Sequence, residues 1–380
     1  MTFNQLKLDS DFRALTIENR TVSVIMKSFL GVSLIWLSVF LVTIVASPGD
    51  NLEAFWECNE VCEFKNHCND AVPDLESNYF ARHEFEETPL LLSSLLFWDC
   101  TSNCDYQCQQ VVTKLRISNA EEIYQFHGKW PFIRMFSFQE MFSTLFSMGN
   151  FFPHYYGYLR LTKAISNYKF YNRESRITLY LVNYTYVAIA GMFAWTASTI
   201  FHWRDLLITE KFDYFFAGMT VLVAFHAIFS RIFRLEKYPK LAKLFFFIVV
   251  GIFSMHILRL YIDWSYTYNM RFNVCFGLLQ YILIIIMAYQ NYRTISGSKQ
   301  IADAYITPSD NHIFKLCIVP ILLVTGIVLA MSLELVDFFS WDWQIDAHAL
   351  WHFCTILPSW VLYDFFLNDF NYMVAKENID

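Results

Sequence analysis

Charge is scarce in this sequence, and positive charge especially so. Only 17% of the 380 residues are charged, whereas soluble domains carry about a quarter. Hydrophobic residues make up 56% of the chain and aromatic residues 19%, so we expect a membrane protein. The net charge is −7. Because binding to a phosphate backbone requires a basic face, this balance excludes nucleic acid as a partner.

The sequence also lacks the CxxC pairs that are usual in zinc-binding domains, although it has nine cysteines. Six of them cluster in one polar stretch downstream of a signal-like segment, which predicts a disulfide framework. Zinc ligation by some of the six is the alternative, and the sequence does not choose among the pairings. The six are Cys58, Cys62, Cys68, Cys100, Cys104 and Cys108, whereas Cys275, Cys317 and Cys354 are expected to pack as apolar residues.

The N-terminal segment resembles a cleaved signal peptide. An apolar run over residues 29–46 follows Lys27 and ends before Ser47-Pro-Gly-Asp50. The run is long for a signal peptide, so a signal anchor is the alternative. Residues 1–26 are unlike an ordinary n-region, which suggests the hypothesis that Met26 is an alternative or the true start of translation. We therefore expect a signal peptide over residues 1–46, with an N-terminal extension, and a small cysteine-rich domain over residues 47–130 that depends on disulfides for stability.

Seven apolar segments follow, and each is close to the roughly 20 residues that cross a bilayer. They lack the period-two alternation of barrel strands, so we expect helices. The sequence predicts an all-α polytopic membrane protein: a seven-transmembrane-helix bundle over residues 131–370, an N-terminal disulfide-rich lumenal domain and a cytosolic tail over residues 371–380. The first segment carries Glu140. The segments span roughly residues 132–158, 179–201, 212–233, 244–262, 272–288, 313–335 and 347–367.

The distribution of basic residues predicts the orientation. Lys and Arg gather in the loops after the first, third and fifth segments, and the alternate loops are acidic or balanced. The positive-inside rule places the basic loops in the cytosol and the cysteine-rich domain in the lumen. The cysteine-rich domain closes on an aromatic and basic stretch, residues 124–134, at the edge of the membrane. We interpret it as an interfacial belt, with contact to a substrate headgroup as the alternative.

Five polar residues are predicted to lie at one depth, in the lumenal leaflet. His348 and His352 are four residues apart and share a helix face at the start of the last span. Ser198 and His202 form a similar pair at the end of the second span, and Asp213 begins the third. Because polar side chains at membrane depth are costly, their convergence predicts a functional site.

These residue types suit a hydrolytic zinc site, with His202, His348 and His352 as three ligands. Zinc lowers the pKa of water to about 7; Asp213 could orient a ligand or accept the proton of the water, and Ser198 could bind the oxyanion. The structural alternative to metal binding is that each histidine only forms a hydrogen bond with a neighbouring helix. A serine hydrolase using Ser198, His202 and Asp213 is the rival mechanism, but no G-x-S-x-G elbow surrounds Ser198. His226 and His256 are interpreted as packing residues.

The spacing of these residues resembles the CREST superfamily of seven-span membrane hydrolases, which includes alkaline ceramidases and the progestin and adiponectin receptor family. Longer motifs resemble the fungal members of its GPI-anchor-remodelling branch, the Per1-like, post-GPI-attachment phospholipase A2 family. These motifs are Ser47–Asp50, Gln125–Phe132, Asp213–Gly218, Leu258–Trp264 and Asp346–His352.

The resemblance implies hydrolysis of the sn-2 acyl ester of the inositol phospholipid on GPI-anchored proteins, in the endoplasmic reticulum membrane. GPI-anchored proteins and membrane lipid are the expected partners, and Zn²⁺ is the expected cofactor. Two alternatives stay open: a ceramidase-like amidase, and a receptor or scaffold with a structural metal site. A structural site should be closed by a fourth protein ligand.

Overall fold

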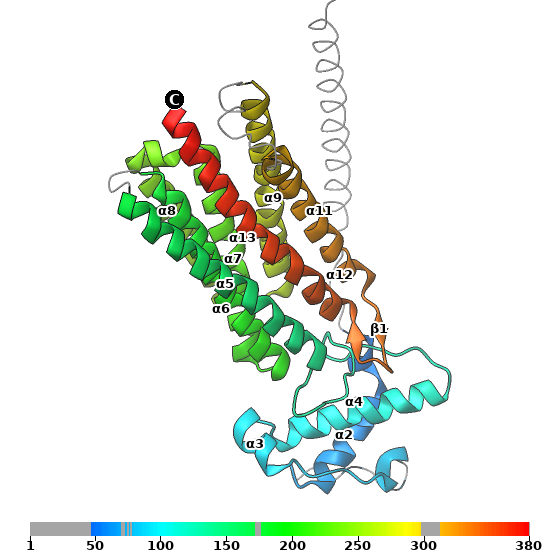
Figure 1. The fold of residues 1–380 in the computed structure, drawn as a ribbon. Helices are drawn as coiled ribbons and strands as arrows, with labels where there is room; N and C mark the ends of the chain where they lie inside the picture. Colours follow the sequence, from blue (N-terminus) through cyan, green and yellow to red (C-terminus); the bar gives the residue numbers. More distant parts are fainter. Residues whose placement is uncertain are drawn as a thin grey trace, which may run out of the picture. The chain divides into compact units, whose positions relative to one another are not determined.

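The chain is mostly helical where the computed structural model describes it, which is over residues 47–69, 73, 76, 78–171, 176–297 and 312–379. Within these residues the sheet structure is one two-stranded hairpin (Figure 1). The all-α prediction is confirmed. The predicted signal peptide and the proposed start at Met26 lie outside the described residues.

Two antiparallel helices joined by disulfides form the centre of the cysteine-rich domain. In α2 (Glu53–Lys65) and in α4 (Cys100–Ser118) the paired cysteines stand four residues apart, so they share one helix face. The two faces meet, and the predicted disulfide framework is confirmed. Zinc ligation by these cysteines is wrong, because all six are used in the bonds Cys58–Cys108, Cys62–Cys104 and Cys68–Cys100.

Short elements complete this domain around a small aromatic core. Phe55, Phe80 and Phe126 are buried against the disulfides. So small a core gives limited hydrophobic stabilisation, and cross-links compensate by restricting the unfolded chain. The short elements are the 3-10 helices η1 (Pro48–Asn51) and η2 (Tyr79–Arg82) and the helix α3 (Leu90–Leu96).

Long helices make up the rest of the chain. Five are long and apolar enough to cross a membrane, which confirms a membrane protein. The helices α5 and α6 are also long enough, at 31 and 26 residues, but they are not among these five. The predicted count of seven spans is therefore compatible with the structure and stays a prediction. The helices are α5 (Met141–Tyr171), α6 (Thr178–Trp203), α7 (Leu207–Ile232), α8 (Pro239–Ile262), α9 (Tyr266–Gly297), α11 (Val319–Met331) with the preceding π-helical turn η4 (Phe314–Ile318), and α13 (Ala347–Ile379).

Short connections separate some of these helices: η3 (Leu235–Lys237), α12 (Leu333–Val336), β1 (Phe339–Ser340) and β2 (Ile345–Asp346). Several boundaries differ from the prediction. The first long helix begins at Met141 rather than near residue 132, and α9 extends beyond residues 272–288 at both ends. The predicted tail continues α13 to Ile379. Hydropathy locates the apolar part of a helix, whereas backbone hydrogen bonds propagate it into polar sequence.

Helix packing brings the predicted site residues into one region. The helix α6 packs between α5 and α7, and α13 packs against α5 (Figure 1). Close approach depends on glycine at two positions. A Cβ atom at Gly157 would stand 2.4 Å from the Tyr363 ring of α13, and one at Gly191 would stand 2.1 Å from the His154 ring. Small residues of this kind allow membrane helices to pack closely.

Candidate metal centre

The start of α13 fixes the positions of His348 and His352. The Asp346 carboxylate accepts a hydrogen bond of 2.7 Å from the Ala349 amide, as an N-cap residue does. The short hairpin of β1 and β2 holds Asp346 in place, since Phe339 pairs with it across the hairpin. The helix therefore begins at Ala347 and presents the two histidines from its first two turns.

The end of α6 fixes the position of His202. The last carbonyls of a helix lack partners within the helix. Here the Glu140 amide donates to the His202 carbonyl and the Gln139 amide donates to the Trp203 carbonyl, each at 3.0 Å. These two bonds also set the start of α5 beside the end of α6. His202 is thus held between two helix ends, at 2% exposure.

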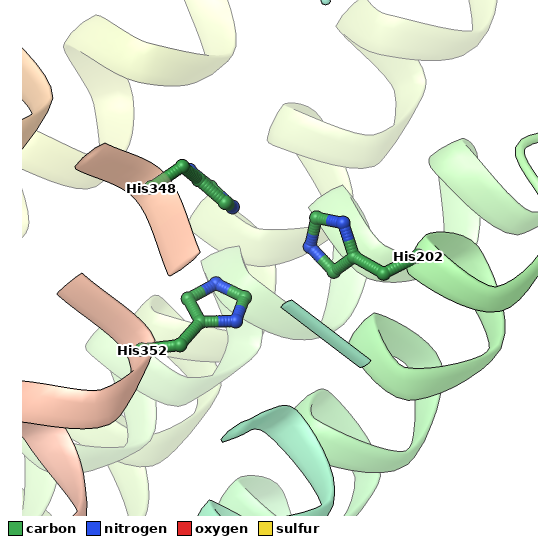
Figure 2. Close-up of side chains that lie close together, drawn as sticks. All are labelled: His202, His348 and His352. Atoms are coloured by element: carbon green, nitrogen blue, oxygen red, sulfur yellow. The ribbon is translucent and has the colours of Figure 1, made fainter. Parts of the chain in front are cut away.

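The three histidines converge from α6 and α13 (Figure 2). Their ring centroids are 5.1 Å apart for His202 and His348, 5.1 Å for His202 and His352, and 4.5 Å for His348 and His352. One nitrogen from each ring lies within 4.8 Å of the other two. Residues separated by about 150 positions therefore form a candidate three-histidine metal site.

The donor set fits a zinc ion. Tetrahedral zinc with bonds of about 2.0–2.1 Å places its nitrogen ligands about 3.4 Å apart, so shifts of about an ångström at each ring would bring the three nitrogens around one ion. The Nε2 atom of His202 is buried and has no hydrogen-bond partner among the residues that the structure describes. Since a buried polar atom normally has a partner, this orphaned nitrogen is consistent with metal ligation.

Two residues that sequence reasoning did not assign to the site orient its histidines. The Nδ1 atom of His202 lies 2.7 Å from Oε2 of Glu140, and Nδ1 of His352 lies 2.9 Å from the Ser147 hydroxyl. Metal-bound histidines commonly donate their second nitrogen in this way, which fixes the ring and its tautomer. The signal for Glu140 was its acidic side chain within an apolar segment. No signal in the sequence marked Ser147.

Ser198 and Asp213 lie beside the three histidines. The Ser198 hydroxyl is 3.1 Å from the Ser147 hydroxyl, and this second hydroxyl also contacts His352. Asp213 of α7 interacts electrostatically with His348 and with Ser198. All five residues named from the sequence are thus brought together, although their roles stay predictions.

Lys129 approaches the centre from the cysteine-rich domain. Its ammonium lies 2.5 Å from Oε1 of Glu140 and 2.9 Å from Oδ2 of Asp205. Burial by itself would lower the pKa of Lys129, but the two carboxylates raise it above its ordinary value. The interpretation of residues 124–134 as an interfacial belt is therefore wrong for Lys129, which pairs with protein carboxylates.

Other histidines in the long helices are used in helix contacts. His256 stacks on Phe272 with ring centroids 3.7 Å apart, and His226 stacks on Phe245 at 5.3 Å. Their interpretation as packing residues is confirmed. His154 lies 2.5 Å from the Tyr363 hydroxyl and accepts a hydrogen bond from Trp195, so it joins α5, α6 and α13.

Known proteins of similar sequence identify the family. The model of the Per1-like family matches residues 89–370, a stretch that includes all five predicted site residues. The Protein PER1 of Saccharomyces cerevisiae is 56% identical over 339 residues, covering 88% of this chain and 94% of the relative. The chain belongs to the Per1-like family. The resemblance of its motifs to that family is confirmed.

Two more distant relatives of this Per1-like protein also match over most of their length, and one of them carries a functional name. The Protein PER1 homolog of Schizosaccharomyces pombe is 35% identical over 88% of this chain and 90% of its own length. The human protein named GPI-specific phospholipase A2-like PGAP3 is 31% identical over 88% of this chain and 92% of its own length. No solved structure matches the chain.

Proposed function

We propose that this Per1-like protein is a zinc-dependent acyl-ester hydrolase that removes the sn-2 acyl chain from the inositol phospholipid of GPI-anchored proteins. The observation that carries the proposal is the convergence of His202, His348 and His352, with Ser198 and Asp213 beside them. The name of the PGAP3 relatives, GPI-specific phospholipase A2-like, supports both the substrate class and the ester bond.

When bound, a zinc ion held by the three imidazoles would act as a Lewis acid and would lower the pKa of its bound water to about 7. The chain supplies the remaining functions. Asp213 accepts the proton of the attacking water, because its carboxylate interacts with His348 at the edge of the site. Ser198 donates a hydrogen bond to the carbonyl oxygen of the ester as negative charge develops on that oxygen. Glu140 and Ser147 keep the Nδ1 atoms of His202 and His352 occupied, which leaves the Nε2 atoms for the metal.

The depth of the site fits a lipid substrate. Asp213 lies near the start of α7 and His202 near the end of α6, so the site lies at one end of the long apolar helices. The positive-inside rule places this end in the lumenal leaflet, where the lipid of a GPI anchor resides while its glycan and protein occupy the lumen. We propose the endoplasmic reticulum as the location, following the family resemblance.

A substitution of one ligand tests the proposal. The purified His348→Ala variant should bind zinc far more weakly and should release no fatty acid from a GPI lipid bearing an sn-2 ester, because two imidazoles remain of three. His226→Ala is the matched control, since His226 stacks on Phe245 away from the site, and it should retain both zinc and activity. Zinc content is measured by mass spectrometry and acyl release by lipid analysis.

The same assay separates the alternative functions. Acyl release from ceramide rather than from the GPI lipid would identify an amidase and overturn the proposed substrate. A wild-type protein that holds zinc but cleaves neither lipid would indicate a structural metal site. Full hydrolytic activity in His348→Ala would contradict the assignment of that ligand.

A further inference from the structure

We propose that Lys129, in the cysteine-rich domain, is a positioning residue for the metal centre, and that it acts through Glu140 on His202. This role rests on the proposed metal site and extends it, because it makes the cysteine-rich domain part of the machinery that orients a ligand. Three linked observations carry it: a turn that presents Lys129, two carboxylates that receive it, and the contact of one of these carboxylates, that of Glu140, with His202.

The turn that presents Lys129 is a tight hairpin. Phe126 and Lys129 exchange backbone hydrogen bonds of 2.8 and 2.9 Å. The two residues between them have positive φ angles, 50° at His127 and 80° at Gly128, as a type I′ turn requires. Glycine adopts such angles without strain. The turn therefore fixes the direction in which the Lys129 side chain leaves the domain.

The start of the domain holds this turn in place. The His127 amide donates to the Asp50 carboxylate and the Gly128 amide donates to the Ser47 hydroxyl, each at 2.7 Å. The Gly49 amide donates to the Gln125 carbonyl, and a Cβ atom at Gly49 would stand 2.4 Å from that oxygen. The motif Ser47-Pro-Gly-Asp50 thus acts as a support for the turn that carries Lys129.

Lys129 reaches two carboxylates at the base of the long helices. Its ammonium lies between Glu140 and Asp205, at 2.5 and 2.9 Å, and 4.0 Å from the centroid of the Phe201 ring. The side chain of Glu140 is only 4% exposed. A buried carboxylate is costly unless a partner of opposite charge compensates it. Lys129 supplies that compensation.

Glu140 uses its other oxygen to hold His202. Oε2 of Glu140 accepts from Nδ1 of His202 at 2.7 Å, so the opposite nitrogen, Nε2, faces the other two histidines. The two carboxylate oxygens of Glu140 thus have different partners: Oε1 contacts Lys129 and Oε2 contacts His202. Without the ammonium, the carboxylate loses its counter-charge and one of its two anchors, and the His202 ring loses its fixed orientation. Removal of such outer partners commonly weakens metal binding by about 10–100-fold.

A double-mutant cycle separates charge compensation from simple domain docking. Lys129→Met should weaken zinc binding by about 10–100-fold. Glu140→Gln should have a smaller effect, because its amide oxygen can still accept from His202 and needs no counter-charge. In the Glu140→Gln background, Lys129→Met should therefore change zinc affinity by less than about threefold. The neutral amide at position 140 leaves no negative charge for the lysine to compensate. Zinc affinity is measured by competition with a chelator on the purified full-length protein in detergent.

Lys211→Met is the matched control, since the Lys211 ammonium lies 5.5 Å from the centroid of the Trp264 ring. Its zinc affinity should be unchanged. An equal loss from Lys129→Met in both backgrounds would show a docking role only and overturn the inference. If the Lys129→Met variant does not accumulate, Glu140→Gln is compared with the double variant instead. A large loss of zinc affinity in the double variant relative to Glu140→Gln would contradict the inference. Failure of the wild-type protein to bind zinc would instead overturn the proposed metal site.

Discussion

At the scale of single residues, the site combines candidate metal ligands with groups that contact their second nitrogens. The Ser147 hydroxyl lies between Nδ1 of His352 and the Ser198 hydroxyl, at 2.9 and 3.1 Å. His202 directs Nδ1 to Glu140 rather than to Asp213. A serine hydrolase relay would require the histidine to link the serine with the aspartate. The observed contacts therefore favour Ser198 as a hydrogen-bond donor to the substrate and disfavour it as a nucleophile.

Substitution of Ser198 tests this role. Ser198→Ala should lower kcat by about 10²–10³-fold, the effect of losing one oxyanion donor, with zinc content unchanged. The measurement is fatty-acid release under single-turnover conditions, with Thr196→Ala as the control, since Thr196 is exposed and donates to the Met192 carbonyl of its own helix. An acyl adduct on Ser198, detected by mass spectrometry of the wild-type protein during turnover, would instead favour the nucleophilic mechanism.

At the scale of helices, glycine determines how closely α5, α6 and α13 approach. The His154 ring is fixed from both sides, by the Tyr363 hydroxyl at 2.5 Å and the Trp195 indole at 3.1 Å, and it lies directly against Gly191. The ring therefore cannot move away without breaking a hydrogen bond. The same helices carry His202 and His352, so their spacing also sets the spacing of the metal ligands.

A methyl group at this contact should separate the helices. Gly191→Ala is expected to destabilise the protein by about 1–3 kcal/mol, the usual effect of overpacking, and to weaken zinc binding. The control is Gly251→Ala in α8, where a Cβ atom would meet nothing within 4 Å. Because alanine favours helix over glycine by about 0.8–1 kcal/mol, this control should be neutral or stabilising. Thermal unfolding in detergent measures the stability of both variants. An equal change in stability for Gly191→Ala and Gly251→Ala would contradict the packing argument.

At the scale of the whole molecule, a buried ionic network joins four of the long helices. The Arg231 guanidinium of α7 donates to both carboxylate oxygens of Asp369 in α13, each at 2.8 Å. Arg231 also donates to Asn291 of α9 at 2.7 Å, and Tyr184 of α6 donates to Asp369 at 3.0 Å. Asp369 is fully buried. Removing one member of such a pair leaves the other charge buried without compensation.

Asp369→Asn should therefore destabilise the bundle by about 3–5 kcal/mol, whereas Arg231→Leu combined with Asp369→Leu should cost less because no charge is left unpaired. Asp364→Asn is the control. Its ion pair with Arg160 is partly exposed, and exposed pairs contribute about 0–1 kcal/mol. Thermal unfolding in detergent compares the three. A double variant as unstable as Asp369→Asn would show that the network stabilises by packing and hydrogen bonding rather than by charge compensation.

The sequence alone determined the fold class and the disulfide domain, and it named five candidate site residues that the structure places together. Hydropathy runs, cysteine clustering and four-residue spacings are local patterns, and each follows from the geometry of one helix or one segment. The pairing of Ser198 with His202, and of His348 with His352, was readable for this reason. The prediction that the Ser198/His202 and His348/His352 pairs meet rested on a further argument. Both pairs are polar and were predicted to lie at the same membrane depth, where polar side chains usually face the interior of a helix bundle.

Only the tertiary structure decided the disulfide pairing, the start of α5 and the second set of residues around the metal centre. Lys129, Glu140 and Ser147 have no spacing that links them to the histidines, because they reach the site from a turn and from a different helix. Their contacts depend on how helices pack and on which buried charges find partners. Those are long-range properties of the folded chain, and of these three residues only Glu140, an acidic side chain in an apolar segment, gave a local signal in the sequence.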